Sequence, residues 1–126
     1  MKMVYLSGGL HSRWQSNVIA ELGDKFKFSD PSNHGLKSPN LYAVWDLHAV
    51  KKCDILFVYI EQSNPSGIGA AFEAGVAKSA GIPIILVDEK SASDEVFGKR
   101  FAIVSELADV VFNNLSDGLS FLNSMR

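Results

Sequence analysis

The sequence predicts a three-layer α/β sandwich built around a parallel sheet. At its centre lie the apolar run Ile55–Ile60, a glycine-rich turn, a helix of small residues and a second apolar run at 82–87. Apolar runs joined through a helix are typical of parallel strands that are buried on both faces. Other short strands alternate with helices along the 126 residues. This alternation favours a single α/β domain spanning residues 1–126.

The remaining elements follow from hydrophobic spacing and from turn residues. Asn40 and Ser116 are the expected N-caps of their helices. The turn-rich segment 29–39 is longer than most connections, and loops of this length are often functional. Residues 88–98 are expected to form a polar loop with a short helical turn. We expect further strands at 3–6, 26–28 and 110–112, and helices at 11–23, 40–52, 102–107 and 116–125.

The helix over residues 40–52 is apolar on nearly all sides. Leu41, Val44, Trp45 and His48 form one stripe, and the opposite side carries a single charge, Asp46. A helix of this kind is covered on both sides. We expect the sheet to cover one side and a pocket or a second subunit to cover the other, which predicts a homo-oligomer.

Composition and charge exclude several classes of protein. With 47% apolar and 21% charged residues the chain has the composition of a globular domain. A net charge of −2 does not favour binding to nucleic acid or to an anionic membrane surface. No apolar run is long enough to span a bilayer. No signal peptide is evident at Met1, and a single cysteine fits a reducing compartment, so we expect a cytoplasmic protein. That cysteine, Cys53, is expected to pack as a small apolar residue. The three histidines lack metal spacing, so we expect neither metal nor cofactor.

Glu73 is the most unusual residue of the central helix. Its neighbours three and four positions away are Gly69, Ala70, Val76 and Ala77, all of them small or apolar. No cation on its own helix can pair with it, and a buried carboxylate needs partners from elsewhere. We expect Glu73 to face a space that the small side chains keep open.

Two kinds of chemistry fit this helix. Gly67 and Gly69 allow close backbone approach, so the helix N-terminus and the Ser66 hydroxyl could bind a phosphate, although a turn that needs glycine for steric reasons explains them equally well. Alternatively, Glu73 could attack the anomeric carbon of a ribosyl group. A phenol at Tyr5 would then orient the carboxylate and favour its ionised form, and Asp46 would serve the leaving base. The competing interpretation makes Tyr5 a core residue and Asp46 a solvated helix charge.

The ends of the predicted strands supply further substrate-binding candidates. Ligands of open parallel sheets bind outside the carboxyl ends of the strands. Ser7, Gly8 and Gly9 end the first strand, and Asp30 follows the second. These four residues therefore join Ser66, Gly67 and Gly69 as predicted substrate contacts.

Several segments together resemble the nucleoside 2-deoxyribosyltransferase family, whose superfamily includes the deoxynucleoside 5′-monophosphate N-glycosidases. They are residues 4–9 (VYLSGG), 46–47 (DL) ahead of 53–56 (CDIL), 67–75 (GIGAAFEAG) and 81–84 (GIPI). The resemblance implies a flavodoxin-like (Rossmann-like) sheet of strand order 2-1-3-4-5 and a homo-oligomer whose sites a neighbouring subunit completes. It also implies that Glu73 is the nucleophile, that Tyr5 orients it and that Asp46 assists at the base.

Two departures from the family pattern concern the substrate. Transferases of free nucleosides usually carry an acid shortly before the glutamate, where this chain has Ser66-Gly67. The monophosphate N-glycosidases carry Pro-Ser there; Pro65-Ser66 is similar, with one residue more before Glu73. We therefore expect cleavage or transfer of the N-glycosidic bond of a 2′-deoxynucleoside or its 5′-monophosphate, with a mild preference for the nucleotide. The alternative is a non-catalytic nucleotide-binding or signalling module of the same fold.

Overall fold

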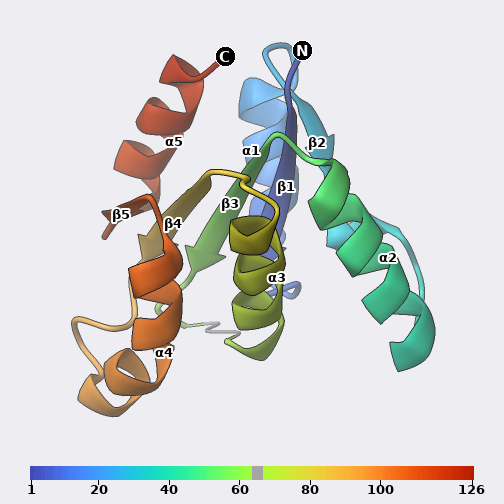
Figure 1. The fold of residues 1–126 in the computed structure, drawn as a ribbon. Helices are drawn as coiled ribbons and strands as arrows, with labels where there is room; N and C mark the ends of the chain where they lie inside the picture. The colour runs from blue at the N-terminus through green and yellow to red at the C-terminus, as the bar shows by residue number, and fades with distance from the viewer. Residues whose placement is uncertain (64–66) are drawn as a thin grey trace.

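The computed structural model describes residues 1–63 and 67–126 of the chain. Its centre is a five-stranded parallel sheet of order β2-β1-β3-β4-β5 (Figure 1). This flavodoxin-like order confirms the predicted sheet. The strands are β1 (Met3–Gly8), β2 (Lys27–Ser29), β3 (Ile55–Ile60), β4 (Ile84–Asp88) and β5 (Val110–Phe112).

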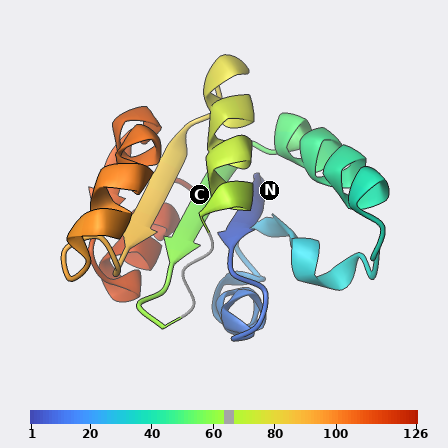
Figure 2. The same ribbon diagram turned by 90° about the horizontal axis from the view of Figure 1, so that it is seen from below.

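Helices cover both faces of the sheet, which confirms the three-layer arrangement (Figures 1 and 2). Helices α1 and α5 pack on one face, and α2, α3 and α4 pack on the other. A short 3₁₀ helix, η1, lies between β2 and α2. The helical bounds are α1 (Trp14–Leu22), η1 (Pro31–Asn33), α2 (Pro39–Lys52), α3 (Ile68–Ser79), α4 (Glu95–Leu107) and α5 (Leu115–Ser124).

Alternation along β1 sends its side chains to two different cores. Val4 and Leu6 pack with Trp14 of α1, whereas Tyr5 packs in the core that α2, α3 and α4 cover. Successive side chains of a strand point to opposite faces, so Ser7 also lies on the Tyr5 side. The strand therefore presents two hydroxyl-bearing residues to the layer that contains α3.

Small residues let α3 approach the sheet closely. Ala70, Ala74 and Ala77 are almost fully buried and form the face of α3 that contacts the strands. Glu73 is buried on the same part of the helix. Its carboxyl group therefore points toward β1 rather than into solvent.

Two helix starts and one helix length differ from the sequence prediction. Helix α2 begins after Ser38, with Pro39 at its first position rather than a cap at Asn40. Helix α5 is capped by Asn114 instead of Ser116. Helix α4 is longer than expected because the Asp94 side chain accepts a hydrogen bond from the Phe97 amide at 3.0 Å, which starts the helix seven residues earlier.

Helix α2 is rotated relative to the predicted apolar stripe. Trp45 and Ala49 turn inward, whereas Leu41 and Val44 are 52% and 66% exposed. Because the helix is apolar on most sides, spacing alone did not identify the packed side. The homo-oligomer expected from this helix stays a prediction.

Several smaller expectations concern packing and membrane contact. Cys53 is buried as predicted, and burial raises the pKa of its thiol to about 11. Strand β4 begins two residues later than expected, at Ile84. Within the two described ranges, no helix is both long and apolar enough to span a bilayer, and no cluster of potential metal ligands occurs.

Candidate active site

A pocket of about 360 Å³ lies at the carboxyl end of β1, beside the first half of α3. Parallel α/β folds bind ligands at this edge of the sheet. The pocket brings together Glu73 and Asp46, the two acids that the sequence singled out, with Gly8 and Gly69 also in its wall. The complete lining is Gly8, Leu10, Pro31, His34, Leu36, Tyr42, Asp46, Gly69, Ala70 and Glu73.

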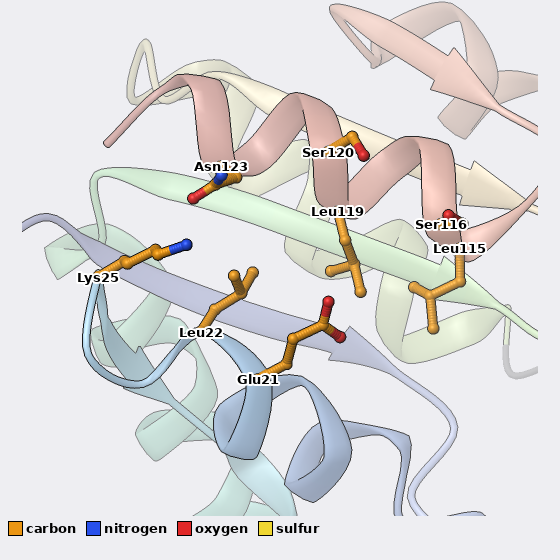
Figure 3. Close-up of a pocket in the computed structure, with 8 residues that line it drawn as sticks. All are labelled: Glu21, Leu22, Lys25, Leu115, Ser116, Leu119, Ser120 and Asn123. Atoms are coloured by element: carbon orange, nitrogen blue, oxygen red, sulfur yellow. The ribbon is translucent and has the colours of Figure 1, made fainter.

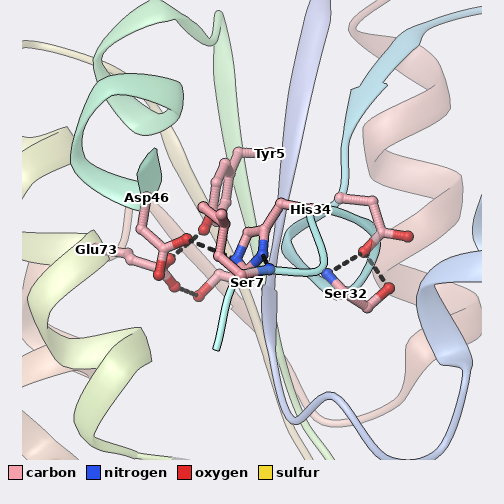
Figure 4. A network of polar contacts seen from close by, with 8 residues as sticks. Tyr5, Ser7, Ser32, His34, Asp46 and Glu73 are labelled. Atoms are coloured by element: carbon pink, nitrogen blue, oxygen red, sulfur yellow. Dashed lines mark hydrogen bonds and ion pairs between the residues drawn. The ribbon is translucent and has the colours of Figure 1, made fainter. Parts of the chain in front are cut away.

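Glu73 is only 6% exposed, and two hydroxyl groups of β1 hold its carboxyl group. The Tyr5 hydroxyl donates a hydrogen bond to Oε2, and the Ser7 hydroxyl donates one to Oε1 at 2.7 Å (Figure 4). The contact predicted between Tyr5 and Glu73 is therefore present. Ser7, predicted as a substrate contact, instead contacts the carboxylate from the same strand. Each carboxylate oxygen thus has one partner from the protein.

Burial dominates the electrostatics of Glu73. Removal from water raises the pKa of its carboxyl group from 4.5 to about 7, while the hydrogen bonds from Tyr5 and Ser7 oppose this rise and the charge of Asp46 adds to it. From the sequence, we expect the Tyr5 phenol to keep the carboxylate ionised. The hydrogen bond acts in that direction, but burial outweighs it, so both forms of Glu73 are populated near neutral pH.

The neighbours of Glu73 favour their protonated forms as well. Burial and the adjacent Glu73 carboxylate raise the pKa of Tyr5 well above its usual range, so its hydroxyl remains a donor. Burial also raises the pKa of Asp46, with His34 and the Tyr5 hydroxyl opposing the rise. The site therefore holds a carboxyl group that ionises near neutrality next to a second acid whose proton is retained more strongly than usual.

His34 is the main site residue that the sequence analysis missed. Its Nε2 atom lies 3.7 Å from Asp46 Oδ1, and its Nδ1 atom accepts a hydrogen bond from the Leu36 amide at 2.9 Å (Figure 4). Its ring also meets Trp45 edge-on, with ring centroids 4.7 Å apart. The available signal was the unusual length of the 29–39 loop, which carries His34 but has no periodicity that marks one residue.

Two glycines of the pocket wall have different reasons to be glycine. Gly8 has a φ of +149°, and a Cβ there would lie 2.3 Å from the Tyr59 carbonyl oxygen, so the backbone itself requires it. A Cβ on Gly69 would meet no protein atom within 4 Å. The lack of a side chain at Gly69 therefore leaves open space in the pocket.

Besides Ser7, three predicted substrate contacts lie outside the pocket lining. The Gly9 carbonyl accepts hydrogen bonds from the Trp14 and Gln15 side chains and anchors the turn after β1. The Asp30 carboxylate caps η1 by accepting from the Ser32 amide at 2.9 Å (Figure 4). Gly67 is the N-cap residue of α3.

Ser66, the remaining predicted substrate contact, lies outside the residues that the structure describes. Its predicted contact with a phosphate therefore stays a prediction. The other wall residues that the sequence did not single out are mostly apolar: Leu10, Pro31, Leu36, Tyr42 and Ala70.

A second pocket, of about 410 Å³, lies between α1 and α5 on the opposite side of the sheet (Figure 3). Glu21 of α1, Lys25 of the turn that follows α1, and the leucines of both helices line it. None of the predicted site residues contributes to it. Its acid, Glu21, is exposed, in contrast to the buried and hydrogen-bonded Glu73. We therefore take the Glu73 pocket as the candidate active site.

These features define a flavodoxin-like α/β domain with a carboxyl-lined pocket at the end of its first strand. No protein-family model and no curated protein matches the sequence. Solved structures share its fold over the whole chain. A 2-deoxyribosyltransferase from Leishmania mexicana aligns with a TM-score of 0.74 at 18% identity, over 98% of both chains.

Two further structures resemble the chain over a similar length. A conserved protein from Enterococcus faecalis V583 aligns with a TM-score of 0.74 at 17% identity, covering 100% of this chain and 99% of that one. The Clostridium botulinum CMP N-glycosidase BcmB aligns with a TM-score of 0.60 at 20% identity, covering 98% and 99%. At these identities the likeness establishes the fold.

Proposed function

We propose that the protein cleaves or transfers the N-glycosidic bond of a 2′-deoxynucleoside or its 5′-monophosphate, with Glu73 as a covalent nucleophile. The observation that carries the proposal is the buried Glu73 carboxyl group, held by two hydroxyls of β1 in the wall of a pocket that also contains Asp46. The fold shared with a 2-deoxyribosyltransferase and a CMP N-glycosidase supports the same class of reaction.

In the first half of the reaction, an oxygen of the ionised Glu73 carboxylate attacks C1′ of the sugar. The bond between C1′ and the base nitrogen breaks, and its electron pair goes to the base. Asp46, in its protonated form, gives its proton to the departing base. The products are the free base and a glycosyl ester on Glu73.

In the second half, water or a second base attacks C1′ and displaces the Glu73 carboxylate. The ionised Asp46 accepts the proton that the incoming nucleophile loses, which restores both acids. Attack by water gives hydrolysis, whereas attack by a base gives transfer.

The two acids need opposite protonation states, and their surroundings support this division. A pKa of about 7 leaves a large fraction of Glu73 ionised at neutral pH. Burial raises the pKa of Asp46, which favours the protonated form that a leaving base requires. Fixed hydroxyl donors from a β-strand also hold the nucleophile in one orientation, as efficient attack demands.

The pocket walls favour a flat, largely apolar group beside Asp46. Leu10, Leu36 and Tyr42 supply apolar surface around the two acids, which suits a nucleobase. The preference for a 5′-monophosphate depends on Ser66 and on the amides at the start of α3, where a helix N-terminus favours an anion.

The experiment is a product analysis on a panel of deoxynucleosides and deoxynucleotides, with and without a second base. We expect release or exchange of the base by the wild-type protein. Glu73→Gln should lower turnover by several powers of ten, as is typical for loss of a nucleophile, and the exposed Glu106→Gln is the matched control. Absence of base release from every compound would reject the proposal and favour the non-catalytic alternative.

The covalent step has its own test. A 2-fluoro sugar substrate slows both steps because fluorine destabilises the oxocarbenium-like transition state. Mass spectrometry of the digested protein should then find the sugar on the peptide that contains Glu73. Turnover without any adduct on this peptide would contradict the covalent route.

A further inference from the structure

The His34–Asp46 pair carries an inference that deepens the proposed function and rests on it. Three titratable side chains face Asp46 from the elements packed around it: Tyr5 from β1, Glu73 from α3 and His34 from the segment before α2. Asp46 Oδ1 is buried and has no hydrogen-bond partner within the described parts of the chain. His34 Nε2, at 3.7 Å, is the polar group paired with it.

The hydrogen bond at the other ring nitrogen fixes where the imidazole carries its proton. His34 Nδ1 accepts from the Leu36 amide at 2.9 Å, so Nδ1 presents a lone pair there. The proton of the neutral ring must then sit on Nε2, which faces Asp46. The backbone of the loop thus aims an N–H donor at the unpartnered carboxylate oxygen.

We propose that His34 is a positioning residue for Asp46, whose Nε2–H holds the carboxyl group in the orientation in which it faces the base. The separation of 3.7 Å is longer than a hydrogen bond, and such contacts often shorten only when the substrate is bound. The edge-on packing against Trp45, itself a residue of α2, keeps the ring beside the helix that carries Asp46. His34 therefore acts on the departing base through Asp46.

The two ring nitrogens have separate partners, so two substitutions can separate their roles. In His34→Asn, the amide oxygen can replace Nδ1 as acceptor for the Leu36 amide, but no donor reaches Asp46. In His34→Gln, the amide nitrogen can reach the position of Nε2, while the acceptor for Leu36 is lost. If His34 only shaped the loop, His34→Gln would be the damaging change.

We expect His34→Asn to lower kcat about tenfold or more with little change in KM, since poor orientation of a general acid reduces catalysis rather than binding. His34→Gln should restore much of this loss. In an Asp46→Asn background, His34→Asn should have no further effect, because the group that it orients is absent. Equal kcat for His34→Asn and wild type, or a larger loss in His34→Gln, would overturn the proposal.

A spectroscopic measurement tests the pair without turnover. The carboxyl carbon of Asp46 can be followed by ¹³C NMR through a pH titration. An N–H donor that faces a carboxylate favours its ionised form, so His34→Asn should move this titration to higher pH. An unchanged titration would count against the pairing.

Nitrogen NMR of the wild-type imidazole covers the case in which His34→Asn fails to fold. We expect Asp46→Asn to shift the Nε2 resonance and leave Nδ1 nearly unchanged; an unchanged Nε2 would overturn the proposal. An inactive wild-type protein that shows this coupling would reject the proposed reaction and keep the pair. An active wild-type protein without this coupling would keep the proposed reaction and reject the pair.

Discussion

Replacing Glu73 by glutamine should change the dependence of stability on pH in a direction that burial dictates. The folded protein raises the pKa of this carboxyl group from 4.5 to about 7. Between these values the folded state keeps a proton that the unfolded chain has lost. The contribution of Glu73 to wild-type stability is therefore fully retained below pH 4.5, falls as the pH rises and levels off above pH 7.

The size of the effect follows from the two pKa values. A shift from 4.5 to about 7 corresponds to about 3.4 kcal/mol in all, of which about 2.5 kcal/mol falls between pH 5 and pH 8. The amide of Glu73→Gln does not titrate, so this loss should vanish in the variant. Relative to wild type, Glu73→Gln should gain about 2.5 kcal/mol in the free energy of unfolding across this range.

Urea denaturation at pH 5, 6, 7 and 8, followed by the fluorescence of the buried Trp14, measures this difference directly. With slopes of about 1–3 kcal/mol/M, the midpoint difference should change by about 1 M or more. Titrating groups that do not interact with Glu73 contribute equally to both proteins and cancel, and the exposed Glu106→Gln controls for loss of a carboxylate. A difference that is constant from pH 5 to pH 8 would refute the argument, because it would mean that Glu73 is already ionised at pH 5.

Three further predictions follow from the same geometry. Tyr5→Phe removes a donor that stabilises the ionised form of Glu73, so the acidic limb of the pH–rate profile should move to higher pH; an unmoved limb would contradict this. Gly69→Ala should leave the melting temperature unchanged and reduce turnover, because its methyl group would occupy open space in the pocket. Gly8→Ala should lower the free energy of unfolding by more than about 1 kcal/mol, and the reverse pattern for the two variants would contradict these roles. Val44→Glu should convert a dimer or larger assembly into a monomer in sedimentation, and a monomeric wild-type protein would remove the predicted interface.

The sheet was predictable because each of its central strands is a continuous apolar run between turn residues. The contact between Tyr5 and Glu73 was predictable for a related reason. Once β1 and β3 are neighbours, the Tyr5 side chain can lie on only one of the two faces of the sheet, and α3 covers one of these faces. A contact set by strand alternation can be derived from sequence.

Other parts of the site depend on packing that spacing does not encode. Helix α2 is apolar nearly all round, so its sequence fits several rotations, and spacing alone did not show which side packs on the sheet. The pairing of His34 with Asp46 joins an aperiodic loop to a helix, and no local pattern reports such a contact. The raised pKa of Glu73 likewise depends on how completely Tyr5 and the alanines of α3 exclude water, a property of the folded site.

In the proposed reaction, the nucleophile and the wall that faces the nucleobase lie on elements of different kinds. Glu73 is held by α3 and by two hydroxyls of β1, elements whose positions the buried core fixes. Much of the wall around Asp46 comes instead from the connection between β2 and α2. In this connection the Nδ1 atom of His34 accepts a hydrogen bond from the Leu36 amide. Changes in this connection can alter the base-facing wall without disturbing the hydroxyls on Glu73, because loops tolerate substitution and the sheet does not. Substitutions between β2 and α2 that leave His34 in place should therefore alter the choice of base while the proposed chemistry is kept.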